Sequence, residues 1–316
     1  MPVMSETTPT LPPRTQQALD AAVTIGRDLG LSVSDASVIY DVFSVVVHLA
    51  PSPVVVRIPT VLPKSARPVE RQQRRQRDEL GVASWLVENG HPAIGPSPLV
   101  PREPVDVDGL SMTFWQWVEQ DHGAEPDYIR NTASTATLHA ILRDYDGGHL
   151  PFLSPAASIE PCLTELSENP DLIDADDLDR AWREWRILKP VVSSAEGLLA
   201  AFPDASVQTI HGDSPPFNLI ETTSGPLFSD FEDVTVGPIE WDLTLTGDEA
   251  IAAYDAAATA KGSRPVDRKL LAVMESLRML QVVACLTLVD ELPILAEGLK
   301  PSIEQWRGMP LAGGLD

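Results

Sequence analysis

Cysteine is scarce in this sequence, and basic residues are outnumbered by acidic ones. Only two cysteines, Cys162 and Cys285, occur in 316 residues, so we expect no disulfide framework and a location in the reducing cytoplasm. The 23 Lys and Arg residues face 46 Asp and Glu residues, which gives a formal net charge of −23. Such a field repels phosphate backbones, so nucleic acid is not an expected partner. The charge is compatible with a cationic substrate, but a generally acidic, soluble surface is the favoured interpretation, so the charge alone does not choose the substrate.

A long uninterrupted apolar run is also missing. The most apolar segment, 270–289, is broken by Glu275, Arg278 and Gln281, which fall along one side of a helix. This pattern predicts a buried helix with a polar stripe, and membrane association is not expected. Residues 1–14 are rich in Thr and Pro without an apolar core, so we expect a disordered tail and not a signal peptide.

One compact block, 211–232, combines turn residues with oxygen-bearing side chains. Asn218 stands just before the apolar pair Leu219-Ile220, and a Thr-Thr-Ser-Gly-Pro cluster then predicts a turn. Asp230 follows the return strand, so it lies at the same open end of the predicted hairpin as Asn218. Oxygen ligands of this kind suit Mg²⁺, which takes few ligands from protein. The block therefore predicts a magnesium site formed by Asn218 and Asp230.

Asp213 lies one loop upstream of the same hairpin end. A carboxylate at this place can accept a proton from a substrate hydroxyl while a metal ion holds the donor phosphates. A rival interpretation makes His211 and Asp213 the ligands of a metallophosphoesterase. Those motifs place Asp before His, and this sequence has no His after His211. His211 is therefore interpreted as a packed, hydrogen-bonded anchor of the loop.

The order His-Gly-Asp at 211–213, Asn218 and Asp-Phe-Glu at 230–232 resembles the aminoglycoside phosphotransferase family, relatives of choline kinases and protein kinases. The continuation Gly-Pro-Ile-Glu-Trp-Asp-Leu at 237–243 is similar to that family as well. The resemblance implies an α+β, two-lobed protein kinase-like fold, with a small mixed β-sheet lobe and a mostly helical lobe. It also implies that Asp213 is the catalytic base and that Asp242 braces the catalytic loop.

A looser similarity covers residues 15 to 300 and implies a domain plan. The plan is a nucleotide-binding lobe over 15–115, a hinge over 116–122, and a catalytic and acceptor-binding lobe over 123–316. By the same resemblance, backbone groups of Gln116, Trp117 and Val118 would bind the edge of the nucleobase. Packing in the core is the alternative for one of the tryptophans in this strand.

The periodicity of the first lobe predicts a helix over 16–29, an apolar strand stretch over 38–49 and a return strand over 54–58. Arg57 is the only charged residue of the return strand. Kinase-like folds carry a cation here, usually Lys, that holds the nucleotide phosphates, and Arg can bind phosphate bidentately. A surface position on an edge strand is the alternative for Arg57.

A helix over 68–89 is expected to carry the glutamate that steadies this cation. We assign this role to Glu79, because the apolar residues around it form the packed face of the helix, with Glu70 as the alternative. The arginines at 67–77 predict a solvated basic face, with a contact to substrate or to a partner as the alternative.

The glycine-rich phosphate loop of kinases is missing, because no glycine lies between Val38 and Val56. Ser44 is the residue in this segment expected to donate to a phosphate. In the second lobe, a helix is expected over 135–145 with a structural His139. The acidic run 171–179 either attracts an amine-bearing substrate or forms a solvated helix start.

The sequence thus predicts a kinase that transfers the γ-phosphoryl group of ATP or GTP, with Mg²⁺, to a hydroxyl of an aminoglycoside-like or other small alcohol. A catalytically weak or inactive kinase-like protein that binds a nucleotide or metabolite is the alternative, suggested by Arg57 and the missing glycines. A sugar, a choline-like amine and a macrolide stay open as acceptors. Acceptor pockets lie on variable loops, so the sequence identifies neither the acceptor nor the oligomeric state.

Overall fold

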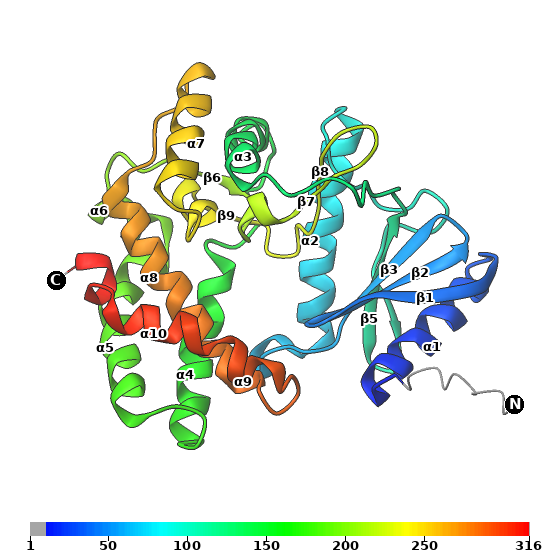
Figure 1. The fold of residues 1–316 in the computed structure, drawn as a ribbon, viewed down its shortest axis with the longest axis horizontal. Coiled ribbons are helices and arrows are strands. Elements are labelled where there is room, and N and C mark those ends of the chain that lie inside the picture. The colour runs from blue at the N-terminus through cyan, green and yellow to red at the C-terminus, as the bar shows by residue number, and fades with distance from the viewer. Residues whose placement is uncertain (1–10, 316) are drawn as a thin grey trace, which may run out of the picture. The chain divides into compact units, whose positions relative to one another are not determined.

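The computed structural model describes residues 11–315, which form an α+β protein with two compact units (Figure 1). The first unit contains residues 11–61 and 96–117, and the second contains 62–95 and 118–315. The expected α+β class is confirmed. Residues 1–10 of the expected tail lie outside the described residues, and a helix already begins at Pro13. Both cysteines are free thiols, and the cytoplasmic location stays a prediction.

The first unit is a five-stranded antiparallel sheet with one helix, and its strand order is β1-β2-β3-β5-β4. Its elements are α1 (Pro13–Asp28), β1 (Val33–Asp41), β2 (Ser44–Pro51), β3 (Val54–Pro59), β4 (Val105–Val107) and β5 (Leu110–Gln116). The helix packs on β1 and β2, where its Ala18 and Ala22 join Val45, Val47 and Leu49 in a closed core. Burial alternates along β3, which puts Val54 and Val56 in this core and Arg57 on the opposite face.

The expected single stretch over 38–49 is wrong, because the chain turns at Val42-Phe43 between β1 and β2. The turn contains no Gly, Pro or Asn, and its local signal is weak: Asp41 and Ser44 flank it, inside a stretch that is otherwise apolar. Tertiary hydrogen bonds hold it instead. The backbone N–H groups of Thr60 and Val61 both donate to the carbonyl of Phe43, at 3.0 and 2.9 Å.

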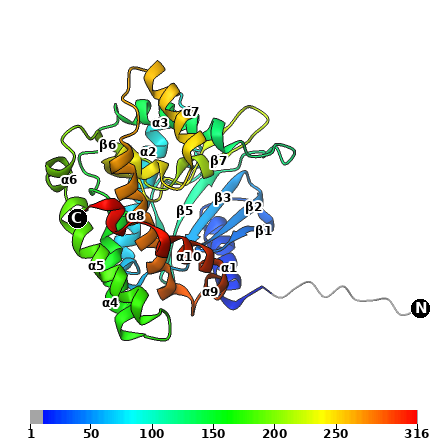
Figure 2. The same cartoon turned by 60° about the vertical axis from the view of Figure 1, so that its left-hand side comes forward.

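The second unit is mostly helical (Figure 2). Its α-helices are α2 (Val69–Glu88), α3 (Tyr128–Leu142), α4 (Ile159–Glu168), α5 (Ala175–Val192), α6 (Ala195–Ala201), α7 (Asp248–Ala260), α8 (Arg268–Ala284), α9 (Ile294–Gly298) and α10 (Lys300–Gly308). Its strands form two antiparallel pairs, β6 (Val207–Ile210) with β9 (Thr235–Pro238), and β7 (Leu219–Ile220) with β8 (Leu227–Phe228). Short 3₁₀ helices are η1 (Lys64–Ala66), η2 (Ser154–Ser158), η3 (Pro215–Phe217), η4 (Ile239–Leu243), η5 (Cys285–Leu288) and η6 (Leu311–Gly314).

The expected helix over 68–89 is confirmed as α2, whereas the helix expected over 135–145 has wrong ends. It begins seven residues earlier, at Tyr128, because the carboxylate of Asp127 caps it by accepting the N–H of Arg130 at 2.9 Å. The polar first turns of this helix do not show the apolar period on which the sequence interpretation relied.

The core of the second unit is organised around α8, which packs against α4, α5 and α10 (Figure 2). Within residues 11–315, the segment 268–288 is the one helical stretch long and apolar enough to cross a membrane, with a mean hydropathy of 1.6. Since 67% of its apolar window is buried inside the protein, it is a core helix here. The expected buried helix is confirmed.

The acidic run 171–179 leads into α5 and is partly neutralised by α10. Asp177, which is 7% exposed, accepts hydrogen bonds from Nε and Nη2 of Arg307 at 3.0 and 2.7 Å. Asp174 adds a longer ion pair to the same guanidinium, at 3.4 Å. The run and α10 also line an open cavity of about 630 Å³. The expected helix start is confirmed, because Asp176 and Asp177 lie in the first turn of α5, and Asp177 is in addition the buried member of an ion-pair cluster.

Candidate active site

The segment that follows β6 makes a tight loop at 211–214 before η3 begins. Gly212 has a φ of +90°, and a Cβ at this position would lie 1.8 Å from the backbone oxygen of Asp233. Only glycine permits both this conformation and this approach of two chain segments. The contact fixes the backbone of Asp213 against the segment that contains Asp230.

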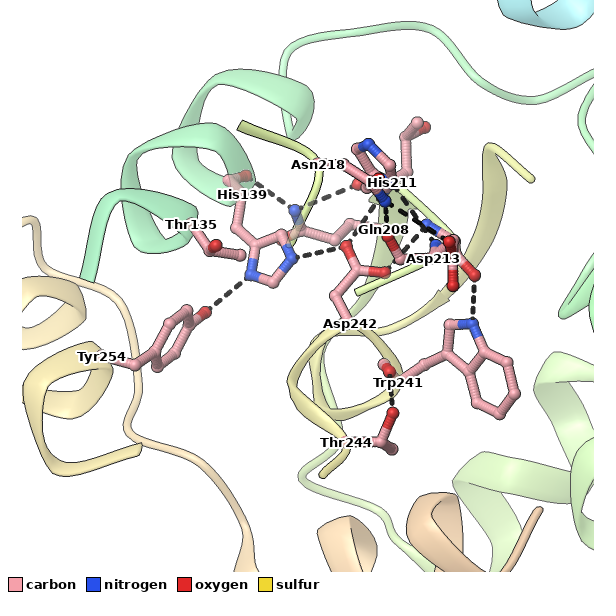
Figure 3. A network of polar contacts seen from close by, with 12 residues as sticks. Thr135, His139, Gln208, His211, Asp213, Asn218, Trp241, Asp242, Thr244 and Tyr254 are labelled. Carbon is pink, nitrogen blue, oxygen red and sulfur yellow. Dashed lines mark hydrogen bonds and ion pairs between the residues drawn. The ribbon is translucent and has the colours of Figure 1, made fainter. Parts of the chain in front are cut away.

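Asp242 of η4 holds this loop through its fully buried carboxylate (Figure 3). The carboxylate accepts the backbone N–H groups of His211 at 2.9 Å and Gly212 at 2.8 Å, and it contacts Nε2 of His139 at 3.0 Å. Burial alone would raise the pKa of Asp242. The hydrogen bonds that Nε2 of His139 and the backbone N–H of Gly212 donate to the carboxylate outweigh burial and hold the pKa of Asp242 below its usual value.

His139 of α3 links Asp242 to α7. Its Nδ1 lies 2.8 Å from the hydroxyl of Tyr254, and both partners are buried. Because a carboxylate faces Nε2, we assign the ring proton to Nε2, so that Nδ1 accepts the Tyr254 hydroxyl. Burial raises the pKa of Tyr254, which keeps the hydroxyl as a donor. The structural role expected for His139 is confirmed.

His211 ties the 211–214 loop to the residue that directly follows β8. Its Nε2 donates to the carbonyl of Ser229 at 2.9 Å, and its Nδ1 accepts the backbone N–H of Asp213 at 3.4 Å. The buried ring also packs on Phe231, with ring centroids 4.6 Å apart. Both ring nitrogens face protein groups, which suits an anchor better than a metal ligand.

The predicted hairpin at 219–228 is confirmed: Leu219 pairs with Phe228 across β7 and β8. At its open end, the backbone N–H and the hydroxyl of Ser229 both donate to the carbonyl of Asn218 at 2.9 Å. Asp230 is the next residue, and its φ of +62° lies in the left-handed region. Such a conformation costs a non-glycine residue roughly 1 kcal/mol or more and is typical of functional sites.

Asn218 also contacts Asp213. Its Nδ2 donates to the backbone oxygen of Asp213 at 2.9 Å and lies 3.3 Å from the carboxylate oxygen Oδ2. Because the amide nitrogen points at Asp213, the amide oxygen of Asn218 is the atom left for a cation. The Asp213 side chain is 42% exposed, so its carboxylate reaches solvent while its backbone is fixed.

The donor set fits Mg²⁺. Within residues 11–315, no group of three or more His, Cys, Asp or Glu side chains forms a protein-only metal cage. Asn218 and Asp230 offer two oxygen ligands from one hairpin end, and Mg²⁺ completes its shell with phosphate oxygens and water.

The comparison with known families agrees with this geometry. A family model described as "Phosphotransferase enzyme family" matches residues 43–278, more than half of the chain. The chain belongs to this family. No curated protein matches it.

Several solved structures share the fold of this phosphotransferase. The GDP and kanamycin complex of the aminoglycoside phosphotransferase APH(2")-IIia is 16% identical, with a TM-score of 0.60 over 92% of this chain and 98% of that one. A microcompartment-associated aminopropanol kinase is 17% identical, with a TM-score of 0.57 over 93% and 99% of the two chains. Choline kinase LicA from Streptococcus pneumoniae is 13% identical, with a TM-score of 0.57 over 89% and 98%. The TM-scores show a shared kinase-like fold, and at these low identities the likeness shows the fold alone.

The residues that the sequence analysis assigned to nucleotide binding are divided between the two units. Ser44, Arg57 and Gln116 belong to the first unit, whereas Val118 and Glu79 belong to the second. Ser44 begins β2 and is 4% exposed, Arg57 is half-buried on β3, and Glu79 is buried on α2. The pairing of Arg57 with Glu79 joins residues of different units and stays a prediction.

Trp117, the other expected hinge residue, is built into the first unit. Its backbone N–H donates to the carbonyl of Pro53 at 3.1 Å. Its ring stacks on His48 of β2, with centroids 3.8 Å apart and an interplanar angle of 5°. The backbone N–H of Trp117 is therefore already hydrogen-bonded. Only the carbonyl or the ring of Trp117 could contact a nucleobase.

The turn between β1 and β2 occupies the place of the missing glycine-rich loop. Asp41, just before the turn, accepts hydrogen bonds from Arg14 and from the hydroxyl of Thr15, both at 2.5 Å. Arg14 also donates to the carbonyl of Val42 at 3.2 Å. The first turn of α1 therefore supplies the restraint on this turn.

Sequence reasoning missed two cations of the second unit. Arg75 of α2, interpreted as part of a solvated face, donates to Asp233 at 2.7 Å, so that interpretation is wrong for this residue. Arg278 of α8 contacts Asp213 at 3.2 Å. Its only signal was the polar stripe of the apolar segment 270–289.

Proposed function

We propose that the chain is a small-molecule kinase that transfers the γ-phosphoryl group of ATP or GTP to a hydroxyl of an amine-bearing small alcohol. One observation carries the proposal. The solvent-reaching carboxylate of Asp213 is held on a rigid loop beside Asn218, at the hairpin end that also carries Asp230.

The proposed role of Asp213 follows from its exposure and its fixed backbone. Its carboxylate orients the acceptor hydroxyl and takes the proton as the hydroxyl oxygen bonds to the γ-phosphorus. The bond to the β,γ-bridging oxygen breaks, and the nucleoside diphosphate leaves. Positioning and charge stabilisation supply most of the catalysis in such transfers.

On the donor side, we assign metal binding to Asn218 and Asp230, and phosphate binding to Arg57. Mg²⁺ bound there would neutralise charge on the donor phosphates. The guanidinium of Arg57 stays charged and can hold two phosphate oxygens at once. The GDP bound in the relative APH(2")-IIia supports a nucleotide as co-substrate.

The acceptor class rests on the relatives and on charge. The similar structures are described as an aminoglycoside phosphotransferase, an aminopropanol kinase and a choline kinase, whose named substrates are all alcohols that carry a cationic nitrogen. A formal net charge of −23 favours the approach of such cations.

The test is release of ADP or GDP in a coupled assay with Mg·ATP and Mg·GTP. The acceptor panel is kanamycin, gentamicin, choline and 1-amino-2-propanol, with glycerol as an uncharged control. We expect release above the water background with at least one amine-bearing alcohol, and a phosphorylated product in mass spectrometry. Nucleotide binding without any product would instead favour the inactive kinase-like alternative.

A further inference from the structure

Arg278 reaches Asp213 from the middle of α8, 65 residues further along the chain. Its Nη1 lies 3.2 Å from Oδ1 of Asp213. The arginine side chain is 9% exposed, whereas the aspartate side chain is 42% exposed. The cation is thus the buried member of the pair, and the carboxylate is the member that faces solvent.

The guanidinium of Arg278 is fixed on several sides. Its Nη1 donates to the amide oxygen of Gln281 at 2.8 Å, and its Nε donates to the hydroxyl of Thr244 at 3.2 Å. Its Cζ lies 4.0 Å from the ring centroid of Trp241, a cation–π contact. Trp241 in turn donates its Nε1 to the carbonyl of Gly212 at 2.5 Å. The same residues therefore hold the arginine and the catalytic loop.

A stability role explains this pair poorly. A buried guanidinium loses hydration free energy. An ion pair with a carboxylate that is 42% exposed recovers little of that free energy, because solvent screens the attraction. The pair of Arg264 and Glu240 shows the opposite arrangement. There the carboxylate is fully buried and the arginine is the more exposed partner, with contacts of 2.7 and 3.0 Å. Arg264 neutralises a buried charge, whereas Arg278 is a buried charge directed at an exposed carboxylate.

We propose that Arg278 is a positioning residue for Asp213, an inference that rests on the proposed function. Arg278 holds Oδ1 and Asn218 lies 3.3 Å from Oδ2, so each carboxylate oxygen has one protein donor. Each oxygen can accept a further hydrogen bond, which leaves an acceptor for the substrate hydroxyl. The carboxylate is thus fixed in rotation and still able to take a proton.

The charges around Asp213 explain why a cation is needed. Asp213 and Asp233 interact unfavourably, since Asp213 contributes to raising the pKa of Asp233 after burial, and Arg278 acts in the opposite direction. An unheld Asp213 carboxylate would turn away from its acidic neighbours into solvent. Arg278 provides the attraction that opposes this rotation.

The experiment compares Arg278→Met and Arg278→Lys in the wild-type and Asp213→Ala backgrounds. The acceptor is the panel member with the highest turnover, or water where none exceeds the background. Misplacement of a catalytic group by about 1 Å costs roughly 10²-fold in rate. We therefore expect kcat to fall 10- to 100-fold in Arg278→Met, with an intermediate fall in Arg278→Lys and an unchanged nucleotide Kd.

A double-mutant cycle separates positioning from a general structural effect. If Arg278 acts through Asp213, Arg278→Met causes no further loss in the Asp213→Ala background. The control is Arg183→Met, which removes an exposed guanidinium of the same unit from α5 and should leave kcat unchanged. The proposal is overturned if Arg278→Lys and Arg278→Met keep wild-type kcat, or if either loss is equal in both backgrounds. If Arg278→Met does not fold, the same double-mutant cycle with Asp213→Ala is measured with Arg278→Lys.

A structural measurement keeps this inference distinct from the proposed function. A wild-type chain without turnover on any acceptor or on water would remove the proposed function. Crystal structures of wild type and Arg278→Lys then decide the positioning role. Displacement of the Asp213 carboxylate in the variant supports the role, and an unchanged carboxylate overturns it.

Discussion

The α-carbon of Gly212 faces the backbone oxygen of Asp233 so closely that a Cβ on Gly212 would lie 1.8 Å from that oxygen. This contact packs the 211–214 loop directly against the segment that carries Asp230. It makes the relative position of Asp213 and Asp230 a property of the backbone, and side-chain contacts from Asp242 and His211 then reinforce it.

Gly212→Ala should be strongly destabilising, because it combines a steric clash with a φ of +90°. We expect the free energy of unfolding to fall by roughly 3 kcal/mol, measured by urea denaturation. Gly225→Ala is the matched control: its φ is +114°, but its Cβ would meet nothing within 4 Å. Only backbone strain of about 1 kcal/mol should appear there. Equal losses in the two variants would contradict the close contact.

Asp242→Asn should destabilise the second unit, because an amide NH₂ group replaces one carboxylate oxygen. That group cannot accept the hydrogen bonds that the N–H groups of His211, Gly212 and His139 donate. We expect a loss of about 3 kcal/mol in the free energy of unfolding. Asp248→Asn, at a fully exposed side chain, should leave the urea midpoint unchanged. An unchanged midpoint in Asp242→Asn would mean that the carboxylate does not brace the loop.

Asp233 should make the protein less stable as pH rises. Burial raises the pKa of Asp233 from 3.8 to about 6, against the attraction of Arg75. The native state therefore binds the proton more tightly than the unfolded chain does. The free-energy cost of ionising Asp233 in the native state is absent below about pH 4 and is complete above about pH 6. Between about pH 4 and pH 6, the free energy of unfolding of the wild type should fall by up to roughly 2 kcal/mol relative to that of Asp233→Asn. Urea titrations with a chelator present measure this difference. A difference independent of pH would refute this assignment.

Asp230→Ala should abolish the Mg²⁺-dependent part of nucleotide binding. The reason is that one of the two proposed oxygen ligands is lost from the hairpin end, while the first unit is untouched. Isothermal titration calorimetry with ATP and GTP, with and without Mg²⁺, measures this part directly. Asp171→Ala, at an exposed carboxylate of the acidic run, serves as the control. Unchanged affinity for the Mg·nucleotide in Asp230→Ala would count against the metal role.

Local patterns predicted the parts of the fold that repeat along the chain. The alternation along β3, the hairpin between Asn218 and Asp230, and the buried helix around Arg278 all follow from periods or turn chemistry within a short window. The family resemblance added the α+β kinase-like fold.

Contacts between distant segments could not be predicted in the same way. Arg75 meets Asp233 158 residues away, and Arg278 meets Asp213 65 residues away. Each arginine has an unremarkable local context, a basic helix face or a polar stripe. The turn at Val42-Phe43 was missed although Asp41 and Ser44 flank it, because the surrounding stretch is apolar and tertiary hydrogen bonds to Phe43 hold the turn.

The most direct test of the account is turnover by Asp213→Ala, with nucleotide affinity measured in parallel. A general base contributes about 10²-fold or more to the rate, and Asp213 is not a proposed ligand of the nucleotide. The account predicts that kcat falls by at least that factor while the Kd for Mg·ATP or Mg·GTP stays close to wild type. Turnover near the wild-type rate in a folded Asp213→Ala variant would contradict it.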